Sequence, residues 1–216
     1  MKEFAVIGMG NFGEMLVRKL TELGCKVTAV DINKTQVQAL QEYADQAILA
    51  NAADRKFLEN LEVSNYDCFI ISTGEDSHAS ILITLYLKEL GAKKIIVKAN
   101  TADHARILYK VGADDVIIPE EDMAVKIAKN LAQPNVLDYL PLSDEYLIAE
   151  IIAPSKFIGK TLKTLKLRTE YHLEVIAIKD KAIKKFNFIP HADYEIQQSD
   201  VLVVLGKEKN IEDIKE

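Results

Sequence analysis

The sequence predicts an α/β fold, in which a doubly wound parallel sheet is followed by a small α+β C-terminal domain. Three observations support this prediction. A glycine-rich turn, residues 8–13, directly follows the apolar run Phe4–Ile7. Short apolar runs then alternate with amphipathic stretches as far as residue 118, which is the rhythm of βαβ units. This rhythm stops after residue 133, where shorter and less regular elements take over.

The elements of the first domain can be assigned in order. Apolar runs predict six strands, at residues 4–7, 27–30, 47–50, 68–72, 95–98 and 116–118. Helical spacing of apolar residues predicts the connecting helices, at residues 12–23, 34–42, 54–61, 77–90 and 102–110. Gly24, Gly91 and Gly112 each follow such a stretch, and glycine readily adopts the left-handed conformation that ends a helix. Together these elements have the size of a complete dinucleotide-binding sheet.

The remaining chain predicts one more helix and then a second domain. The helix, at about 120–131, follows Pro119, and Gln133-Pro134-Asn135 interrupts the pattern after it. We therefore expect domains at residues 1–133 and 134–216. The elements expected in the second domain are strands at Tyr146–Ala153, Leu173–Lys179, Lys181–Phe186 and Val201–Leu205, and helices at residues 160–167 and 208–216.

Composition excludes several classes of protein. The net charge of −6 argues against general nucleic-acid binding, which needs a basic surface. No apolar stretch approaches the roughly 20 residues that span a bilayer, and Met1-Lys2-Glu3 leads straight into a strand, so no signal peptide is expected. Cys25 and Cys68 stand alone in or beside apolar strands, which predicts small buried side chains in a reduced, cytoplasmic setting.

The glycine-rich turn has the chemistry of a phosphate-binding loop. In the pattern Gly-x-Gly-x-x-Gly, Gly8 permits the tight turn, Gly10 lets the backbone approach a phosphate, and Gly13 lets the helix pack closely on the strand. The amides at the start of that helix point at the anion. This context predicts a Rossmann-type nucleotide-binding domain.

An acidic residue ends the second predicted strand. The carboxylate of Asp31 can accept hydrogen bonds from ribose 2′ and 3′ hydroxyls and disfavours a 2′-phosphate. It does not separate NAD from ATP or ADP, which share the same adenosine ribose. The alternative is that Asp31 only caps the helix that starts near Lys34.

Further polar residues stand at the carboxyl ends of other strands, where ligands bind in this fold. Asn51 can offer an amide to an adenine edge or serve as a turn residue. The segment Ser72-Thr73-Gly74-Glu75 follows the fourth strand, and Lys98, a cation suited to phosphate, ends the fifth. His104 opens the next helix and either reaches the nucleotide or has a surface role.

The second domain contains a basic segment. Between Lys156 and Lys185 nine basic residues face only three acidic ones. This excess is typical of a solvated basic face, and the alternative is a pocket for a phosphorylated ligand around Arg168 and the strand Val175–Ile178. No pairing of nucleophile and base indicates a catalytic centre anywhere in the chain, so we expect binding without turnover and not an enzyme.

Several segments, in order along the chain, resemble one known family. They are Phe4–Gly13, Val30–Asn33, Leu87–Leu90, Val97–Asn100, Gly112–Asp114, Ile118–Ala124, Asn135–Tyr139 and Leu142–Tyr146. The chain resembles the RCK (KTN) domain regulatory subunits of bacterial potassium uptake systems, the KtrA/TrkA-like proteins. The nucleotide-binding shell indicated by the motif and by this resemblance is Gly8, Gly10, Asn11, Phe12, Gly13, Asp31, Ile32, Asn33, Asn51, Ala52, Thr73, Gly74, Glu75, Lys98, Ala99, Asn100, His104 and Glu120.

The resemblance implies a homo-octameric ring of dimers on the cytoplasmic face of a membrane-embedded potassium-translocating subunit of the KtrB/TrkH kind. Exchange of ATP against ADP, or of NADH against NAD, would change the shape of the ring and gate the transporter. Glu120 would help to hold a divalent or monovalent cation near the terminal phosphates, or it is only a carboxylate at the start of a helix. Some relatives also bind cyclic di-AMP in the C-terminal domain.

Two points leave alternatives open. Close relatives often carry arginine where this chain has Asn11, and arginine can clamp a γ-phosphate through two hydrogen bonds. Asparagine brings no charge, so discrimination of ATP from ADP is less secure here. The alternative function is a small NAD-dependent oxidoreductase, which the glycine motif and Asp31 would also suit.

Overall fold

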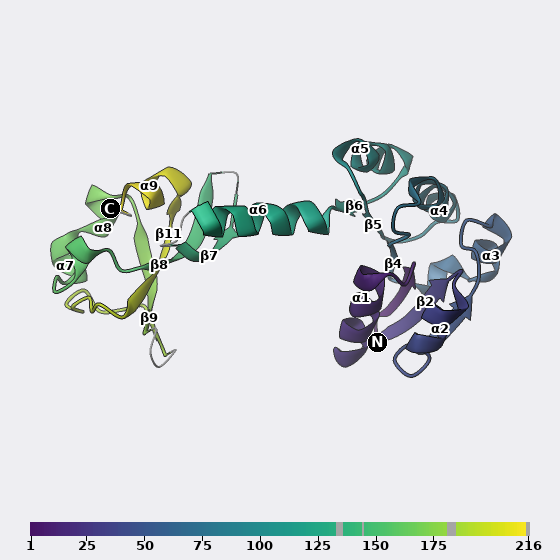
Figure 1. Cartoon of the computed structure of the whole chain (residues 1–216), viewed down its shortest axis with the longest axis horizontal. Coiled ribbons are helices and arrows are strands. Elements are labelled where there is room, and N and C mark those ends of the chain that lie inside the picture. Colours follow the sequence, from purple (N-terminus) through teal and green to yellow (C-terminus); the bar gives the residue numbers. More distant parts are fainter. Residues whose placement is uncertain (133–135, 144, 181–184, 215–216) are drawn as a thin grey trace. The chain divides into compact units, whose positions relative to one another are not determined.

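The computed structural model describes residues 1–132, 136–143, 145–180 and 185–214 (Figure 1). The chain forms two compact units, Met1–Asp122 and Met123–Glu216. The division falls inside helix α6 (Pro119–Ala132), whereas the sequence predicts a domain boundary after that helix. The assignment of α6 to the first domain therefore stays a prediction, and the two units are described separately below.

The first unit is a six-stranded parallel sheet with helices between its strands (Figure 1). The strand order is β3-β2-β1-β4-β5-β6, and every neighbouring pair is parallel. The strands are β1 (Glu3–Ile7), β2 (Lys26–Asp31), β3 (Gln46–Leu49), β4 (Cys68–Ile71), β5 (Ile95–Lys98) and β6 (Asp115–Ile117). The helices are α1 (Asn11–Glu22), α2 (Lys34–Leu40), α3 (Arg55–Asn60), α4 (Ser77–Glu89) and α5 (Ala102–Val111), with a 3₁₀ turn η1 (Val63–Asn65) before β4. The predicted doubly wound sheet is confirmed.

The core of this unit lies on both faces of the sheet. Along β1, Ala5 belongs to one buried apolar cluster and Val6 to another, and along β4 Phe69 and Ile70 divide in the same way. Successive side chains of a strand point to opposite faces, so the two clusters lie on opposite sides of the sheet. Burial on both faces explains why these strands are continuous apolar runs.

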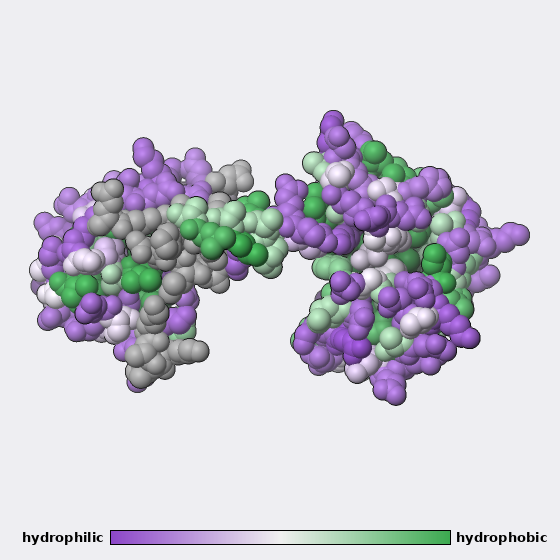
Figure 2. Space-filling view, in the orientation of Figure 1, coloured by the Kyte–Doolittle hydropathy of each residue, from purple (hydrophilic) through white to green (hydrophobic). Residues whose placement is uncertain are grey.

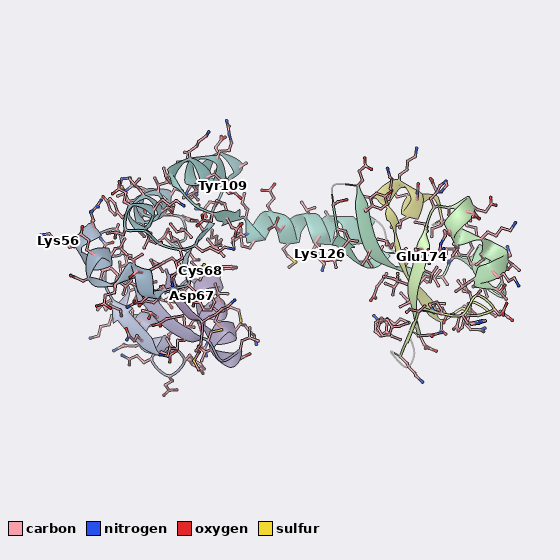
Figure 3. The ribbon with its side chains drawn as sticks, turned by 180° about the vertical axis from the view of Figure 1, so that it is seen from behind. Lys56, Asp67, Cys68, Tyr109, Lys126 and Glu174 are labelled. Carbon is pink, nitrogen blue, oxygen red and sulfur yellow. The ribbon has the colours of Figure 1, made fainter. Side chains whose placement is uncertain are left out.

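A carboxylate fixes the amino end of the two central strands. Asp67, just before β4, accepts a hydrogen bond of 2.9 Å from the backbone N–H of Glu3 at the start of β1. This bond, together with Lys93, lowers the pKa of Asp67. Figure 3 labels Asp67 and the neighbouring Cys68, which is buried at the start of β4. The hydrogen bond between Asp67 and Glu3 holds β1 and β4 together at the edge opposite the carboxyl ends, where ligands bind in this class of fold.

The second unit contains a five-stranded antiparallel sheet of order β10-β9-β11-β8-β7. Its strands are β7 (Val136–Pro141), β8 (Tyr146–Ile152), β9 (Glu174–Asp180), β10 (Phe186–Phe188) and β11 (Asp200–Lys207). Its helices are η2 (Ser155–Phe157), α7 (Leu162–Leu165), α8 (Leu167–Glu170) and α9 (Glu208–Asp213). A small α+β domain was predicted here, and this class is confirmed.

Two details of the second unit differ from the prediction, and a third can be compared only in part. Strand β7 was missed, because its sequence contains Asp138, ends in Pro141 and lacks a clean alternation. The single helix expected at 160–167 is two short helices, since Lys166 between them has a φ of +49° and ends the first. Of the strand expected at Lys181–Phe186, residues 181–184 lie outside the described residues, and β10 begins at Phe186.

Candidate functional site

A cavity of about 530 Å³ opens at the carboxyl ends of the central strands of the first unit. It lies where the strand order reverses on the two sides of β1, the point at which ligands bind in open α/β sheets. Eight of the predicted site residues line it, namely Gly8, Gly10, Asp31, Ile32, Asn51, Ala52, Thr73 and Gly74. The structure thus brings together segments that are as much as 66 positions apart, from residue 8 to residue 74.

Two of the three glycines are required by the packing of the chain itself. Gly8 has a φ of +94°, and a Cβ there would lie 2.2 Å from the carbonyl oxygen of Ser72. A Cβ on Gly13 would lie 2.0 Å from the carbonyl oxygen of Gly8. Gly10 is different, because its φ is −70° and a Cβ would meet nothing within 4 Å. Among the described residues nothing explains glycine at position 10, whereas a ligand that approaches its backbone would.

The start of α1 has no side-chain cap. Gly10 is the N-cap residue of this helix and offers no side chain to the amides of the first turn. The N-cap residues of α2 to α5 are Asn33, Asp54, Asp76 and Thr101, and each of them accepts a hydrogen bond from its helix. Uncapped amides carry the positive end of the helix dipole and form a site for an anion such as phosphate.

Asp31 connects the glycine-rich loop to the end of β2. Its Oδ2 accepts a hydrogen bond of 2.5 Å from the backbone N–H of Met9, and its Oδ1 accepts one of 2.7 Å from that of Asn33. The cap of α2 is Asn33, which accepts from Thr35 N–H, so the alternative in which Asp31 caps this helix is wrong. Each carboxylate oxygen can accept a second hydrogen bond, as a ribose diol would require.

The loop after β3 supplies one wall of the cavity. The side-chain oxygen of Asn51 accepts a hydrogen bond of 3.0 Å from Ala53 N–H, so its role as a turn residue is real. The amide NH₂ of Asn51 remains as the part that can donate to a ligand. Both functions proposed for this residue are therefore compatible.

Helix α4 supplies a wall that the sequence-based prediction missed. Ala79, Leu82 and Ile83 line the cavity with His78, and the first three form one apolar face of the helix. Their spacing of three and four positions was visible in the sequence, but such spacing is equally typical of a core helix. This apolar wall is suited to the ring of a purine base.

The rim over β5 and β6 is organised by an ion pair. Lys98 Nζ lies 2.5 Å from a carboxylate oxygen of Glu120, and the exposed fractions of the two side chains are 14% and 69%. The hydrogen bond from Lys98 holds the pKa of Glu120 below its usual value. Neither residue lines the cavity. Ala99 is fully buried and donates its N–H to Ile117, so it offers no side-chain atom to a ligand.

His104 is buried, so the alternative of a surface role is wrong. Its Nδ1 accepts a hydrogen bond from the backbone N–H of Asn100, and its Nε2 lies 2.9 Å from the hydroxyl of Ser80. Burial lowers the pKa of His104, because the charged ring would lose solvation there, and so favours the neutral ring. A direct contact between His104 and a nucleotide stays a prediction.

The remaining predicted residues lie around the cavity without lining it. Asn11 and Glu75 are exposed, Phe12 is partly buried, and Gly13 is buried against Gly8. Among the described residues, no group of three or more His, Cys, Asp or Glu side chains is placed to hold a metal ion. A role for Glu120 as a metal ligand stays a prediction.

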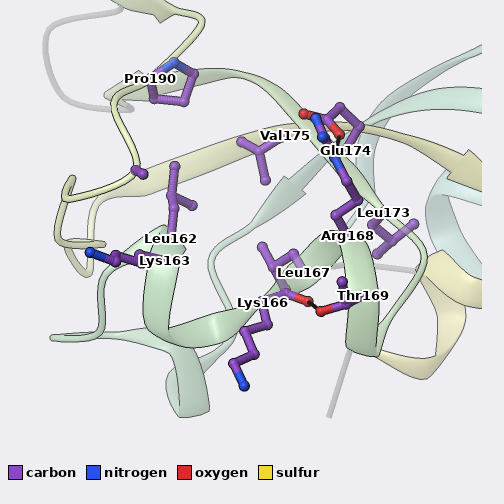
Figure 4. A pocket seen from close by; sticks show the side chains of 11 residues that line it. Leu162, Lys163, Lys166, Leu167, Arg168, Thr169, Leu173, Glu174, Val175 and Pro190 are labelled. Atoms are coloured by element: carbon purple, nitrogen blue, oxygen red, sulfur yellow. Dashed lines mark hydrogen bonds and ion pairs between the residues drawn. The ribbon is translucent and has the colours of Figure 1, made fainter.

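A second candidate site lies in the second unit (Figure 4). A pocket of about 360 Å³ has an apolar floor that includes Leu167 and Val175, and Lys163, Lys166 and Arg168 stand around it. The Nε of Arg168 donates a hydrogen bond of 2.6 Å to Glu174, which lowers the pKa of that carboxyl group. A pocket therefore lies around Arg168, where the alternative to a solvated basic face placed one, with part of its positive charge already paired, and its use by a phosphorylated ligand stays a prediction.

In the part of the chain that the structure describes, no helix is both long enough and apolar enough to cross a membrane.

The sequence was compared with models of known protein families. Residues 4–119 match the TrkA-N domain and residues 147–216 match the TrkA-C domain.

Full-length relatives match as well. The Ktr system potassium uptake protein C of Bacillus subtilis is 43% identical over 210 residues, which cover 97% of this chain and 94% of the relative. The Ktr system potassium uptake protein A of the same organism is 41% identical with the same coverage. Among solved structures, the GsuK channel bound to NAD superposes with a TM-score of 0.67 at 18% identity, covering 100% of this chain and 39% of the channel chain. The chain belongs to the family of Ktr and Trk system potassium uptake proteins, with a TrkA-N domain followed by a TrkA-C domain.

Proposed function

We propose that this chain is a regulatory subunit of a potassium uptake system, and that it senses an adenine nucleotide in the cavity of its first unit. The names of the two relatives support a role in potassium uptake, since each is named a potassium uptake protein and is aligned with this chain over nearly its full length. The observation that carries nucleotide binding is the glycine at position 10, which the packing does not need, at the uncapped start of α1.

The residues of the cavity fit an adenosine phosphate in three parts. The amides of α1 would hold the phosphates, Asp31 would accept the ribose hydroxyls, and Ile32, Ala52 and the α4 wall would enclose the base. ATP, ADP and NAD(H) all share these groups. One neighbour in fold is described as bound to NAD, which supports NAD(H) beside ATP and ADP. Asn11 supplies no charge for a γ-phosphate, so we expect weak discrimination of ATP from ADP.

The proposed mechanism is binding without chemical turnover. A ligand shifts a conformational equilibrium only by the difference in its affinity for the two states. A change from 1:99 to 99:1 needs about 5.5 kcal/mol, and the subunits of a ring that move together share this requirement. One charge-assisted phosphate contact, worth about 1.5–3 kcal/mol, is more than each subunit of an octamer must contribute.

We propose further that the chain forms a homo-octameric ring of dimers at the cytoplasmic face of a membrane-embedded potassium-translocating subunit. Met123, Ile127 and Leu131, four positions apart along α6, have exposed fractions of 55%, 51% and 78%. Figure 2 shows hydrophobic surface along this helix. An apolar stripe of this kind favours association. Light scattering on the purified chain would test the ring, since an octamer has eight times the chain mass of 24.2 kDa.

The pocket of the second unit supports a proposed second ligand. Lys163, Lys166 and Arg168 over an apolar floor suit a phosphorylated nucleotide with a base to bury, and cyclic di-AMP is the candidate. A cation held by Glu120 near the nucleotide phosphates is the other proposed effector. Calorimetry with cyclic di-AMP, and ADP titrations with and without divalent ions, would test each of them.

The function as a whole can be tested by potassium uptake. A bacterial strain that lacks its own uptake systems would express the membrane subunit alone, or together with this chain. We expect uptake to respond to the nucleotide only when the chain is present, and to lose that response when Gly10 is replaced. Turnover of NADH with a small substrate by the chain alone would instead support an oxidoreductase.

A further inference from the structure

We infer that His104 is a positioning residue of the nucleotide cavity, which acts through Asn100 on Gly74 and needs no contact with the ligand. This inference rests on the proposed function of the cavity. The three residues come from three segments, namely α5, the loop after β5 and the loop after β4. Of the three, only Gly74 lines the cavity.

The hydrogen bonds of His104 determine which ring nitrogen carries the proton. The backbone N–H of Asn100 can only donate, and it points at Nδ1 over 3.3 Å, so Nδ1 is the acceptor. A neutral ring then carries its proton on Nε2, which donates to the Ser80 hydroxyl at 2.9 Å. That hydroxyl in turn donates to the carbonyl oxygen of Ser77. The exposed fractions of His104 and Ser80 are 6% and 1%, so water does not compete for these bonds.

The same residue, Asn100, reaches the rim of the cavity. Its side-chain amide donates a hydrogen bond of 2.8 Å to the carbonyl oxygen of Gly74. Gly74 has a φ of +65°, and a Cβ there would meet nothing within 4 Å, so no packing contact at this position fixes its conformation. Hydrogen bonds between Thr73 and Asp76 close the turn around Gly74. The Asn100 amide adds the restraint on the Gly74 carbonyl, and His104 holds the backbone of Asn100. The ring of His104 therefore restrains the rim of the cavity through Asn100, without lining the cavity itself.

The two halves of the imidazole can be separated by substitution. In His104→Asn the side-chain oxygen takes the place of Nδ1 and can still accept from Asn100. In His104→Gln the amide takes the place of Nε2 and can still donate to Ser80, but the acceptor for Asn100 is lost. If His104 only stabilised the fold, both substitutions would change ADP affinity and hydrogen exchange by about the same amount.

The test measures ADP affinity by calorimetry on the full-length chain, with thermal melts to confirm folding. We expect Kd to rise about tenfold in His104→Gln and in Asn100→Ala, and to stay within about threefold in His104→Asn. The double variant Asn100→Ala/His104→Gln should be no weaker than either single variant, because both act on one path. His191→Gln, an exposed histidine of the other unit, is the matched control.

A second readout needs no ligand. Hydrogen exchange of the segment around Gly74 should accelerate in His104→Gln and Asn100→Ala and stay unchanged in His104→Asn and His191→Gln. Equal effects of Gln and Asn at position 104, or unaltered exchange at Gly74, would overturn the inference. A failure of the unaltered chain to bind ADP, with the exchange pattern as expected, would refute the proposed function while the positioning of Gly74 stands.

Discussion

Lys98 and Glu120 form an ion pair, with 2.5 Å between the ammonium nitrogen and a carboxylate oxygen, at the carboxyl end of β5. The lysine is mostly buried and the glutamate mostly exposed, so the cation is fixed while its partner can be exchanged. A phosphate or a metal ion that enters this rim would have to compete for one member of the pair. The pair therefore links the carboxyl end of β5 to the first turn of α6.

Replacing Glu120 and replacing Lys98 should have opposite effects on the affinity for ADP. In the presence of a chelator, Glu120→Gln should strengthen binding, because the carboxylate no longer competes for Lys98. Lys98→Gln should weaken it by about tenfold or more, the size of a lost charge-assisted hydrogen bond. Calorimetry at low and high salt would measure both. Asp115→Asn is the control, since it breaks the Lys94–Asp115 pair at the opposite end of the same strands. Weaker binding by Glu120→Gln without metal would contradict competition.

Alanine substitutions at the three glycines of the turn should affect protein stability and ADP binding differently. Gly8→Ala and Gly13→Ala should each lower the free energy of unfolding by about 1–3 kcal/mol or more, because each Cβ meets a carbonyl oxygen at 2.2 Å or less. Gly10→Ala should cost under about 1 kcal/mol, the difference between the two residues at an N-cap, yet abolish ADP binding. Urea unfolding and calorimetry would measure the two properties. A Gly10→Ala variant that binds ADP normally would remove the main support for the phosphate site.

Asp31 should determine the preference for an unphosphorylated ribose. We expect NAD to bind at least about tenfold more tightly than NADP, because a 2′-phosphate would face the carboxylate. Asp31→Asn should reduce this preference. It should also destabilise the fold by about 1–3 kcal/mol, since an amide cannot accept at both oxygens from Met9 and Asn33. Fluorescence competition with the two cofactors would measure the preference, and equal affinities in the unaltered chain would argue against ribose recognition by Asp31.

The two cysteines should differ in reactivity. Burial raises the pKa of Cys68 to about 11, so at pH 8 it is almost entirely the unreactive thiol. Cys25 is only partly buried. A thiol reagent such as DTNB should therefore label one cysteine quickly in the native chain and both after unfolding. The Cys25→Ser variant should show no fast phase, and a fast phase in that variant would mean that β4 opens readily.

The regular part of the fold could be predicted because its signals are local. Residues 1–118 contain continuous apolar runs, glycines that end helices, and a regular alternation of strand and helix. The errors fell where local signals are weak. Strand β7 is defined by its pairing with β8 more than by its own sequence pattern. The break at Lys166 depends on a left-handed backbone conformation, which a lysine in the sequence does not indicate.

The site was predictable only in part, for a similar reason. Gly8, Gly10 and Asp31 could be found because the motif fixes their spacing. The α4 wall with Leu82 and the buried position of His104 arise from tertiary packing, which places an apolar helix face over a ligand cavity and a histidine beneath its rim. In the sequence Leu82 is indistinguishable from a core helix residue, and nothing there decides between a surface position and a buried one for His104.

The most direct test is a crystal structure of the full-length chain grown with excess ADP. The account predicts the diphosphate against the first amides of α1, the ribose hydroxyls on the Asp31 carboxylate, and the adenine between the loop after β3 and the α4 wall. A cavity that stays free of nucleotide at saturating ADP, or ADP bound only elsewhere on the chain, would contradict it.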